Sequence, residues 1–227
     1  MNQTAPDLTL LRVLQLASPA LPVGSYAYSQ GMEWAVTAGW VHDEMSLASW
    51  VDTQLRHSFG PTDLPLFARL YDAARGDDGA AQVVWSRRLL ARRETRELVA
   101  DDCDRGRALA RLLHGLGVAS APPWMERDDA PFAALVAVAA VAWDIPLVPA
   151  AHALAWSWLE NQVLVGVKLI PLGQVAGQRV LFDLARTIPE VCGDGLARGD
   201  DDIGGTLPIV AIASSLHETQ YSRLFRS

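Results

Sequence analysis

The sequence has few cysteines and few lysines, and no long uninterrupted apolar run. Cys103 and Cys192 are too few for a disulfide framework and too far apart for a zinc site, so we interpret both as reduced thiols. The most apolar stretch, residues 131–172, is broken by prolines and polar residues and cannot supply about 20 consecutive apolar residues for a membrane span. Residues 1–7 do not resemble a secretory signal, so we expect a cytoplasmic protein.

Basic residues are fewer than acidic ones. The formal net charge is −7 and the isoelectric point is near 5.2, which argues against binding to nucleic acid or to an anionic membrane. Of the 19 basic residues, Lys168 is the only lysine. Because arginine supplies positive charge everywhere else, we interpret this one lysine as answering a local need.

Sequence motifs of common enzymes are missing as well. The sequence contains no P-loop, no Gly-x-Ser-x-Gly elbow, no His-Glu-x-x-His and no dinucleotide-binding glycine pattern. We therefore predict a protein that is not an enzyme and needs no cofactor. An enzyme with a site that no short motif marks stays as the alternative.

What is present predicts an all-α fold. Half of the residues are hydrophobic and alanine is abundant, which favours helices around a sizeable core. Apolar spacing and capping residues predict roughly ten helices in one domain, residues 1–215, followed by a C-terminal arm, residues 216–227. The expected helices cover residues 8–18, 33–37, about 46–55, 64–74, 80–90, 94–113, 132–143, 150–162 and 175–186.

Three stretches are less certain in type. Residues 163–170 fit either a buried strand or the end of the preceding helix, and we favour the helix because no partner strand is evident. Residues 193–205, which contain Asp200-Asp201-Asp202, read as an exposed or partly disordered loop. A short apolar segment, residues 207–213, leads into the arm.

Two features are candidates for a site, the polar loop at residues 21–33 and the single lysine, Lys168. The loop at residues 21–33 places Tyr28, Gln30 and Glu33 among glycines, as either a packed inter-helix loop or a surface for a partner or a channel mouth. Lys168 lies within an apolar run, so we expect it to be buried and paired with a carboxylate, and a reactive lysine is the alternative. Residues 92–97 alternate in charge, which is typical of a solvated helix face.

The C-terminal arm carries the last candidate. Tyr221, Leu224 and Phe225 are spaced as one face of a helix and are flanked by Arg223 and Arg226. This pattern is typical of a helical peptide that lays apolar anchors in a partner's groove, with arginines at the rim. The alternative is that the arm, which starts at about His217, docks on its own domain.

Five segments, in order along the chain, resemble the UreF family of urease accessory proteins. They are residues 14–24 with 28–33 (LQLASPALPVG, YSQGME), 62–69 (TDLPLFAR), 93–97 (RETRE), 166–174 (GVKLIPLGQ) and the arm. The resemblance covers nearly the whole chain. It implies an all-helical, homodimeric, non-enzymatic chaperone for nickel insertion into the urease apoprotein. It also implies two cytoplasmic partners, a scaffold called UreD or UreH and the GTPase UreG.

The resemblance gives the candidate residues possible roles. His217, Tyr221, Arg223, Leu224, Phe225 and Arg226 would contact the scaffold, and we expect the arm to become ordered only with that partner. Glu33 and Lys168 would form a partly buried ion pair that faces the GTPase. Alternatively, these two residues would line a path for nickel together with Tyr28 and Gln30.

A competing hypothesis is that the chain itself binds nickel, through His217 with Glu218 or through Asp200–Asp202. Two adjacent ligands cannot complete a nickel site, which needs four to six donors. We therefore predict no metal site in the chain.

Overall fold

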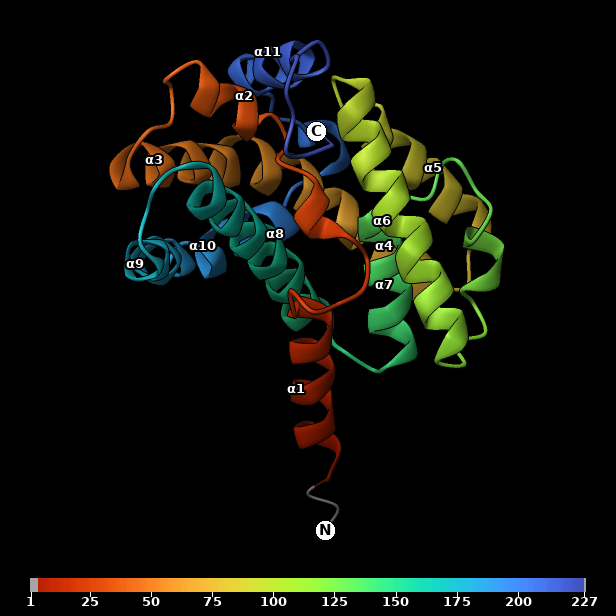
Figure 1. Cartoon of the computed structure of the whole chain (residues 1–227). Helices are drawn as coiled ribbons and strands as arrows, with labels where there is room; N and C mark the ends of the chain where they lie inside the picture. Colours follow the sequence, from red (N-terminus) through yellow and green to blue (C-terminus); the bar gives the residue numbers. More distant parts are fainter. Residues whose placement is uncertain (1–3, 227) are drawn as a thin grey trace.

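The protein is all helical in the computed structural model, which describes residues 4–226 (Figure 1). These residues form eleven α-helices and no strand, which confirms the predicted fold class. The helices are α1 (Thr4–Ala17), α2 (Met32–Thr37), α3 (Glu44–Gln54), α4 (Leu64–Arg75), α5 (Gly79–Leu90), α6 (Arg96–Gly115), α7 (Phe132–Ala142), α8 (Leu147–Leu169), α9 (Gln174–Ala185), α10 (Ile188–Leu196) and α11 (Pro208–His217).

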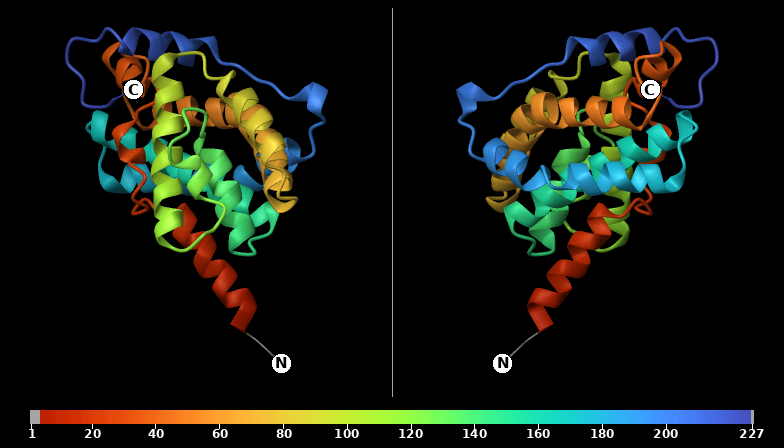
Figure 2. Two further views of the ribbon diagram at one scale, coloured as in Figure 1. Left: turned by 90° about the vertical axis from the view of Figure 1, so that its right-hand side faces the viewer. Right: turned by 90° about the vertical axis from the view of Figure 1, so that its left-hand side faces the viewer.

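The core is built around α7 and α8. Helix α7 is made of alanine, valine, leucine and phenylalanine on all sides, and residues 132–140 are all buried. A helix that is apolar all round needs neighbours on every side, and α4, α6 and α8 supply them. Helix α1 packs its C-terminal end on α8 and projects away from the body at its other end (Figures 1 and 2).

Local sequence signals fix several helix ends. Asp43 caps α3 by accepting from the backbone N–H of Ser46 at 2.8 Å, and Ser46 Oγ accepts in return from the N–H of Asp43 at 3.0 Å. Residues 163–169 form the end of α8, so the helical interpretation of this stretch is confirmed.

Helix α4 begins at Leu64, as expected, but no break separates it from α3. A π-helix, Leu55–Asp63, continues α3 directly into α4 and contains Pro61. Proline has no N–H to donate, and the wider π-turn accommodates it within a continuous helix. The N–H of Gly204 donates to the carbonyl of Pro61, which ties the chain before α11 to this helix.

Helix α10 occupies part of the stretch expected to be a loop. Its packing on the π-helix needs glycine, because a Cβ at Gly195 would lie 2.6 Å from the carbonyl oxygen of Gly60. Glycine-rich sequence has low helix propensity, but here it permits a close helix contact that stabilises the helix. Within the stretch expected to be a loop, residues 197–205 lie outside α-helices, and residues 200–202 form a short 3₁₀ turn.

The predicted boundary between domain and arm falls inside α11, which ends at His217. Residues 218–226 then fold back over α2 and the loop before it, so this segment is docked rather than free (Figure 1). Ser227, which we also assigned to the arm, lies outside the described residues. None of the helices in residues 4–226 combines the length and the apolar character needed to cross a membrane.

Candidate functional site at the C-terminal segment

Glu33, in the first turn of α2, holds the C-terminal segment. Its buried carboxylate accepts the backbone N–H groups of Leu224 at 2.6 Å and Phe225 at 2.9 Å. It lies at a helix start because Gly31, with φ of 84°, caps α2 and lets α11 approach closely. A Cβ at Gly31 would be 2.8 Å from the backbone nitrogen of Ser214, so only glycine permits this contact.

His217 connects this carboxylate to α6. Its Nε2 lies 3.1 Å from Glu33 and its Nδ1 lies 2.8 Å from Glu97, and the ring is fully buried. Both ring nitrogens face carboxylates, and both can donate only in the imidazolium form. The other oxygen of Glu97 accepts from Arg223 at 2.8 Å. The chain Glu33–His217–Glu97–Arg223 thereby joins α2, α11, α6 and the C-terminal segment.

Phe225 completes the docking. Its side chain is buried, with the ammonium of Lys168 4.7 Å from the ring centre, and the N–H of Arg226 donates to the carbonyl of Ala27 at 2.8 Å. The prediction of a helical arm is therefore wrong, since residues 218–226 form turns and bends rather than a helix. The physical reason is that Glu33 takes backbone N–H groups that a helix would use internally.

The anchors of the arm consequently point in different directions. Phe225 faces its own domain, as in the alternative, whereas Tyr221 is fully exposed and Leu224 is more than half exposed. Arg223 and Arg226 are also exposed, although Arg223 is held by Glu97.

The expected ion pair between Glu33 and Lys168 is not formed. Lys168 is exposed rather than buried, because the last turn of α8 turns this side chain to the surface. Glu33 pairs with His217 instead. The two predicted residues still act on one segment, since Glu33 binds the backbone of Phe225 and Lys168 lies over its ring.

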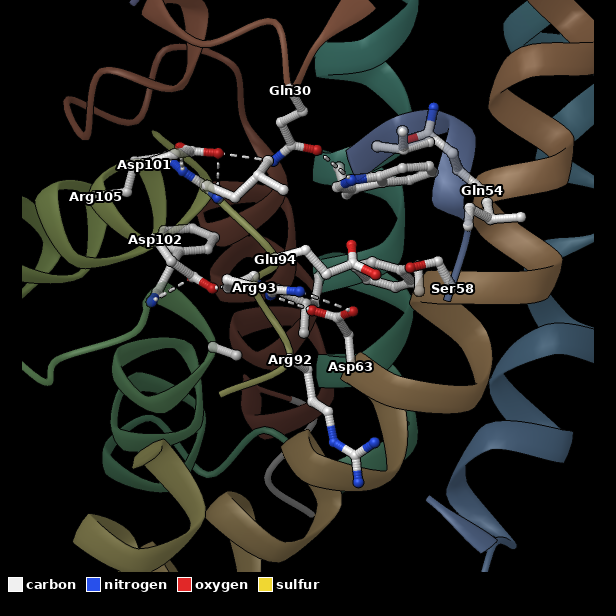
Figure 3. A pocket seen from close by; sticks show the side chains of 18 of the residues that line it. Gln30, Gln54, Ser58, Asp63, Arg92, Arg93, Glu94, Asp101, Asp102 and Arg105 are labelled. Carbon is white, nitrogen blue, oxygen red and sulfur yellow. Dashed lines mark hydrogen bonds and ion pairs between the residues drawn. The ribbon is translucent and has the colours of Figure 1, made fainter. Parts of the chain in front are cut away.

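Gln30, from the loop at residues 21–33, lines a second site, a polar cavity of about 80 Å³ (Figure 3). Its Nε2 donates to Asp101 at 2.7 Å, and its Oε1 accepts from the side chains of Trp158 and Gln162, each at 3.0 Å. These three contacts hold Gln30 at φ of 54°, a strained value for a residue other than glycine.

Tyr28 lies close by and donates to Asp104 at 2.8 Å. Burial, and then the hydrogen bond to Asp104, raise the pKa of Tyr28 to about 12. The phenol is therefore a fixed neutral donor across the physiological pH range.

The wall of the polar cavity carries a buried charge cluster. Arg93 lies between Asp63 at 2.5 Å and Asp102 at 2.7 Å, and Arg105 pairs with Asp101 (Figure 3). Burial raises the pKa of Asp63 and Asp101 despite their arginine partners. Burial acts on Asp102 in the same direction, but Arg93 and Arg105 outweigh it and lower the pKa of that carboxyl.

The expectation of a solvated face at residues 92–97 is wrong for three of these residues. Arg93 is mostly buried between two aspartates, Thr95 caps α6 by accepting from the N–H of Leu98, and Glu97 binds His217. Alternating charges here serve contacts with other elements, which the local pattern does not reveal.

No group of three or more histidine, cysteine, aspartate or glutamate side chains in residues 4–226 is arranged to hold a metal ion. His217 already uses both ring nitrogens on Glu33 and Glu97.

The sequence matches known proteins over its whole length. A sequence model of the UreF family matches residues 41–185. A urease accessory protein UreF from Alkalilimnicola ehrlichii is 50% identical over 226 residues, covering 100% of this chain and 99% of the relative. UreF of a Pseudomonas putida strain is 52% identical over 221 residues, 97% of this chain and 99% of the relative. UreF of Klebsiella pneumoniae is 48% identical over 217 residues, 96% and 97% of the two chains.

The chain belongs to the UreF family. The matched range of the family model includes the buried charge cluster and Lys168, whereas Glu33 and the C-terminal segment lie outside it. The first relative covers both, because its alignment spans the full chain. Membership makes this a urease accessory protein and confirms the resemblance inferred from the five sequence segments.

Several residues of the UreF fold's polar sites were not predicted from the sequence. Asp63, Glu97, Asp101, Asp102 and Arg105 carry the charge cluster and the histidine contact. One signal was present: Asp102 lies four residues after Leu98 and seven before Leu109, on the apolar face of α6. A carboxylate on such a face requires a buried partner.

Proposed function

We propose that this UreF-family protein is a non-enzymatic maturation factor that supports nickel insertion into the urease apoprotein through protein contacts. In this proposal it acts in the cytoplasm, bridges a UreD/UreH-type scaffold and a UreG-type GTPase, and couples the state of the GTPase to metal transfer. Its family membership and the name of its relatives, urease accessory protein, support the urease role.

The observation that carries scaffold binding is the exposed apolar surface at the C-terminal end. Tyr221 and Leu224 extend from the docked segment, and Ile212 and Leu216 are exposed one turn apart on α11, which leads into it. We call these four side chains the tail surface. Exposed apolar groups with arginines nearby are typical of interface anchors. Because Glu33, His217 and Phe225 fix the backbone, the tail surface is presented already ordered, which lowers the entropic cost of binding.

Contact with the GTPase is assigned to the surface around Lys168. This lysine is exposed beside the docked segment, so a partner there would touch both Lys168 and residues next to Phe225. Glu33 acts indirectly by holding that segment. Gln30 lines the polar cavity, with Tyr28 close by, and this cavity is the candidate border of a nickel path.

Self-association is assigned to α1. Helix α1 projects from the body (Figure 2), and Leu8, Leu10, Leu11 and Leu14 are each 54–60% exposed on it. Arg12 instead lies over the ring of Trp143. An amphipathic helix normally turns its leucines inward. A free leucine face on a helix of this length supports a homodimer in which a second copy covers it.

Co-expression with the urease accessory proteins tests the proposal. The informative truncation removes residues 218–227, because His217 belongs to the buried part of the fold. We expect the truncated protein to remain folded and dimeric but to lose the scaffold and to leave urease inactive. Full recovery of the scaffold and of urease activity with the truncated protein would contradict the role of the tail surface.

A further inference from the structure

A mainly apolar groove of about 110 Å³ follows helix α8, where the end of α1 and the C-terminal segment meet it. One wall is a single face of α8 that begins at Ser157 and ends at Lys168. With a rise of about 1.5 Å per residue, this face is roughly 16 Å long. The end of α1 and the loop at residues 21–33 form the other wall, to which they contribute Leu16 and Val23.

Lys168 brings a positive charge to one end of the groove. Its ammonium lies 4.7 Å from the ring centre of Phe225, and both residues line the groove, so the charged atom lies at the groove itself. The side chain is exposed, and among residues 4–226 no carboxylate forms an ion pair with it. Contact with a ring face does not use up the three N–H donors of an ammonium. Lys168 is therefore free to bind a carboxylate from outside the chain.

Glu160 gives the groove an acidic end. It lies on the same face of α8, about two turns and roughly 12 Å before Lys168, so the two charges do not neutralise each other. Burial raises the pKa of this carboxyl. Glu160 and Lys168 are the only charged residues in the described lining, and Leu164, Val165 and Val23 make the lining between them apolar.

We propose that this groove binds a segment of a partner protein in which a carboxylate lies beside an apolar side chain. The carboxylate pairs with Lys168, and the apolar side chain enters the groove between Lys168 and Glu160. The inference rests on the proposed contact between the GTPase and the surface around Lys168, and it names the chemistry of that contact.

The charges of the groove argue against other segments. A basic residue at the Lys168 end would meet a like charge, and a carboxylate at the other end would meet Glu160. A purely apolar segment would cover the ammonium without giving it a partner.

The test uses the full-length protein with ¹³C-labelled leucine and valine methyl groups, because Leu164 and Val165 line the groove. The probe is the peptide Gly-Leu-Asp-Leu-Gly, blocked at both ends so that its side chain carries the only carboxylate. We expect it to shift the groove methyl signals with a Kd of about 1–5 mM, while Val84, exposed on α5, stays unchanged. Replacing its Asp by Asn, or both Leu by Ser, should weaken binding about 5-fold, and replacing the Asp by Lys should abolish it.

Two substitutions separate the charge from the groove. Lys168→Met keeps the apolar stem and should make the Asp and Asn peptides bind equally, whereas the exposed control Arg111→Met should preserve their difference. Leu164→Ser, at a side chain that is 43% exposed, should weaken both peptides about 5-fold. Equal binding of the Asp, Asn and Lys peptides to the wild type would overturn the carboxylate assignment. No response of the groove methyl groups to any peptide would overturn the site.

Binding of a purified UreG-type GTPase to the same variants distinguishes this inference from the proposed function. Loss of GTPase binding in Lys168→Met without any peptide response would overturn the groove and leave the GTPase assignment standing. Unchanged GTPase binding with the expected peptide response would support the groove and overturn the GTPase as its partner. Loss of the dimer in Leu164→Ser, measured by sedimentation, would assign the groove to a second copy of the chain and overturn the inference.

Discussion

Replacing Glu33 with glutamine should release the C-terminal segment without unfolding the protein. The carboxylate accepts the N–H groups of Leu224 and Phe225, one on each oxygen. Each hydrogen bond to an ionised group contributes about 1.5–3 kcal/mol. Glutamine retains one acceptor oxygen and turns an NH₂ donor toward the other amide, so at least one bond is lost. The expected cost to local docking is about 1.5–3 kcal/mol, or roughly 10- to 150-fold faster opening.

Amide hydrogen exchange measures this opening directly. In Glu33→Gln the amides of Leu224 and Phe225 should exchange roughly 10- to 150-fold faster, while those of the buried helix α7 keep their protection. Glu126→Gln is the control, because it removes the same charge at an exposed position. The reasoning is refuted if the two C-terminal amides keep their wild-type protection in Glu33→Gln, or if both variants change them equally.

Three further predictions concern the cavity, the tyrosine and the lysine. Arg93→Met should lower the free energy of unfolding by about 3–5 kcal/mol in urea titrations, since it leaves two buried aspartates unpaired; a similar loss in the exposed control Arg111→Met would contradict this. Because the pKa of Tyr28 is raised to about 12, the neutral phenol stabilises the folded protein fully below its unfolded pKa of about 10, and this stabilisation is lost as the pH rises through about 12. Tyr28→Phe should remove that late step from an ultraviolet titration. Lys168→Ala should reduce stability by no more than about 1 kcal/mol, because its contact with Phe225 is at the surface, yet impair urease activation; unfolding of the variant would make its role structural.

Local patterns predicted the helices well. Spacing and propensity alone predict the apolar helix α7 and the helical end of α8. These features depend on neighbouring residues in sequence, which is the information that periodicity contains.

Long-range contacts decided what the patterns missed. Tyr221, Leu224 and Phe225 have helical spacing, but Glu33, almost 200 residues earlier in the chain, binds the backbone of this segment in a turn. Arg93 looked solvated because its neighbours alternate in charge, whereas two aspartates from other parts of the fold bury it. Glu33 lies 192 residues from Phe225, and Asp63 lies 30 residues from Arg93, so no local window contains either pair. Asp102 is only nine residues from Arg93, but its burial depends on the packing of α6 rather than on the local charge pattern.

Binding of a purified UreD/UreH-type scaffold to the Tyr221→Ala/Leu224→Ala double variant tests the central proposal most directly. Tyr221 is fully exposed and Leu224 is more than half exposed, so the variant should fold and dimerise normally. We predict an affinity at least about 30-fold below that of the wild type, while Met45→Ala/Val175→Ala, equally exposed on α3 and α9, should bind as the wild type does. Wild-type affinity in the Tyr221→Ala/Leu224→Ala variant would contradict the assignment of the tail surface to the scaffold.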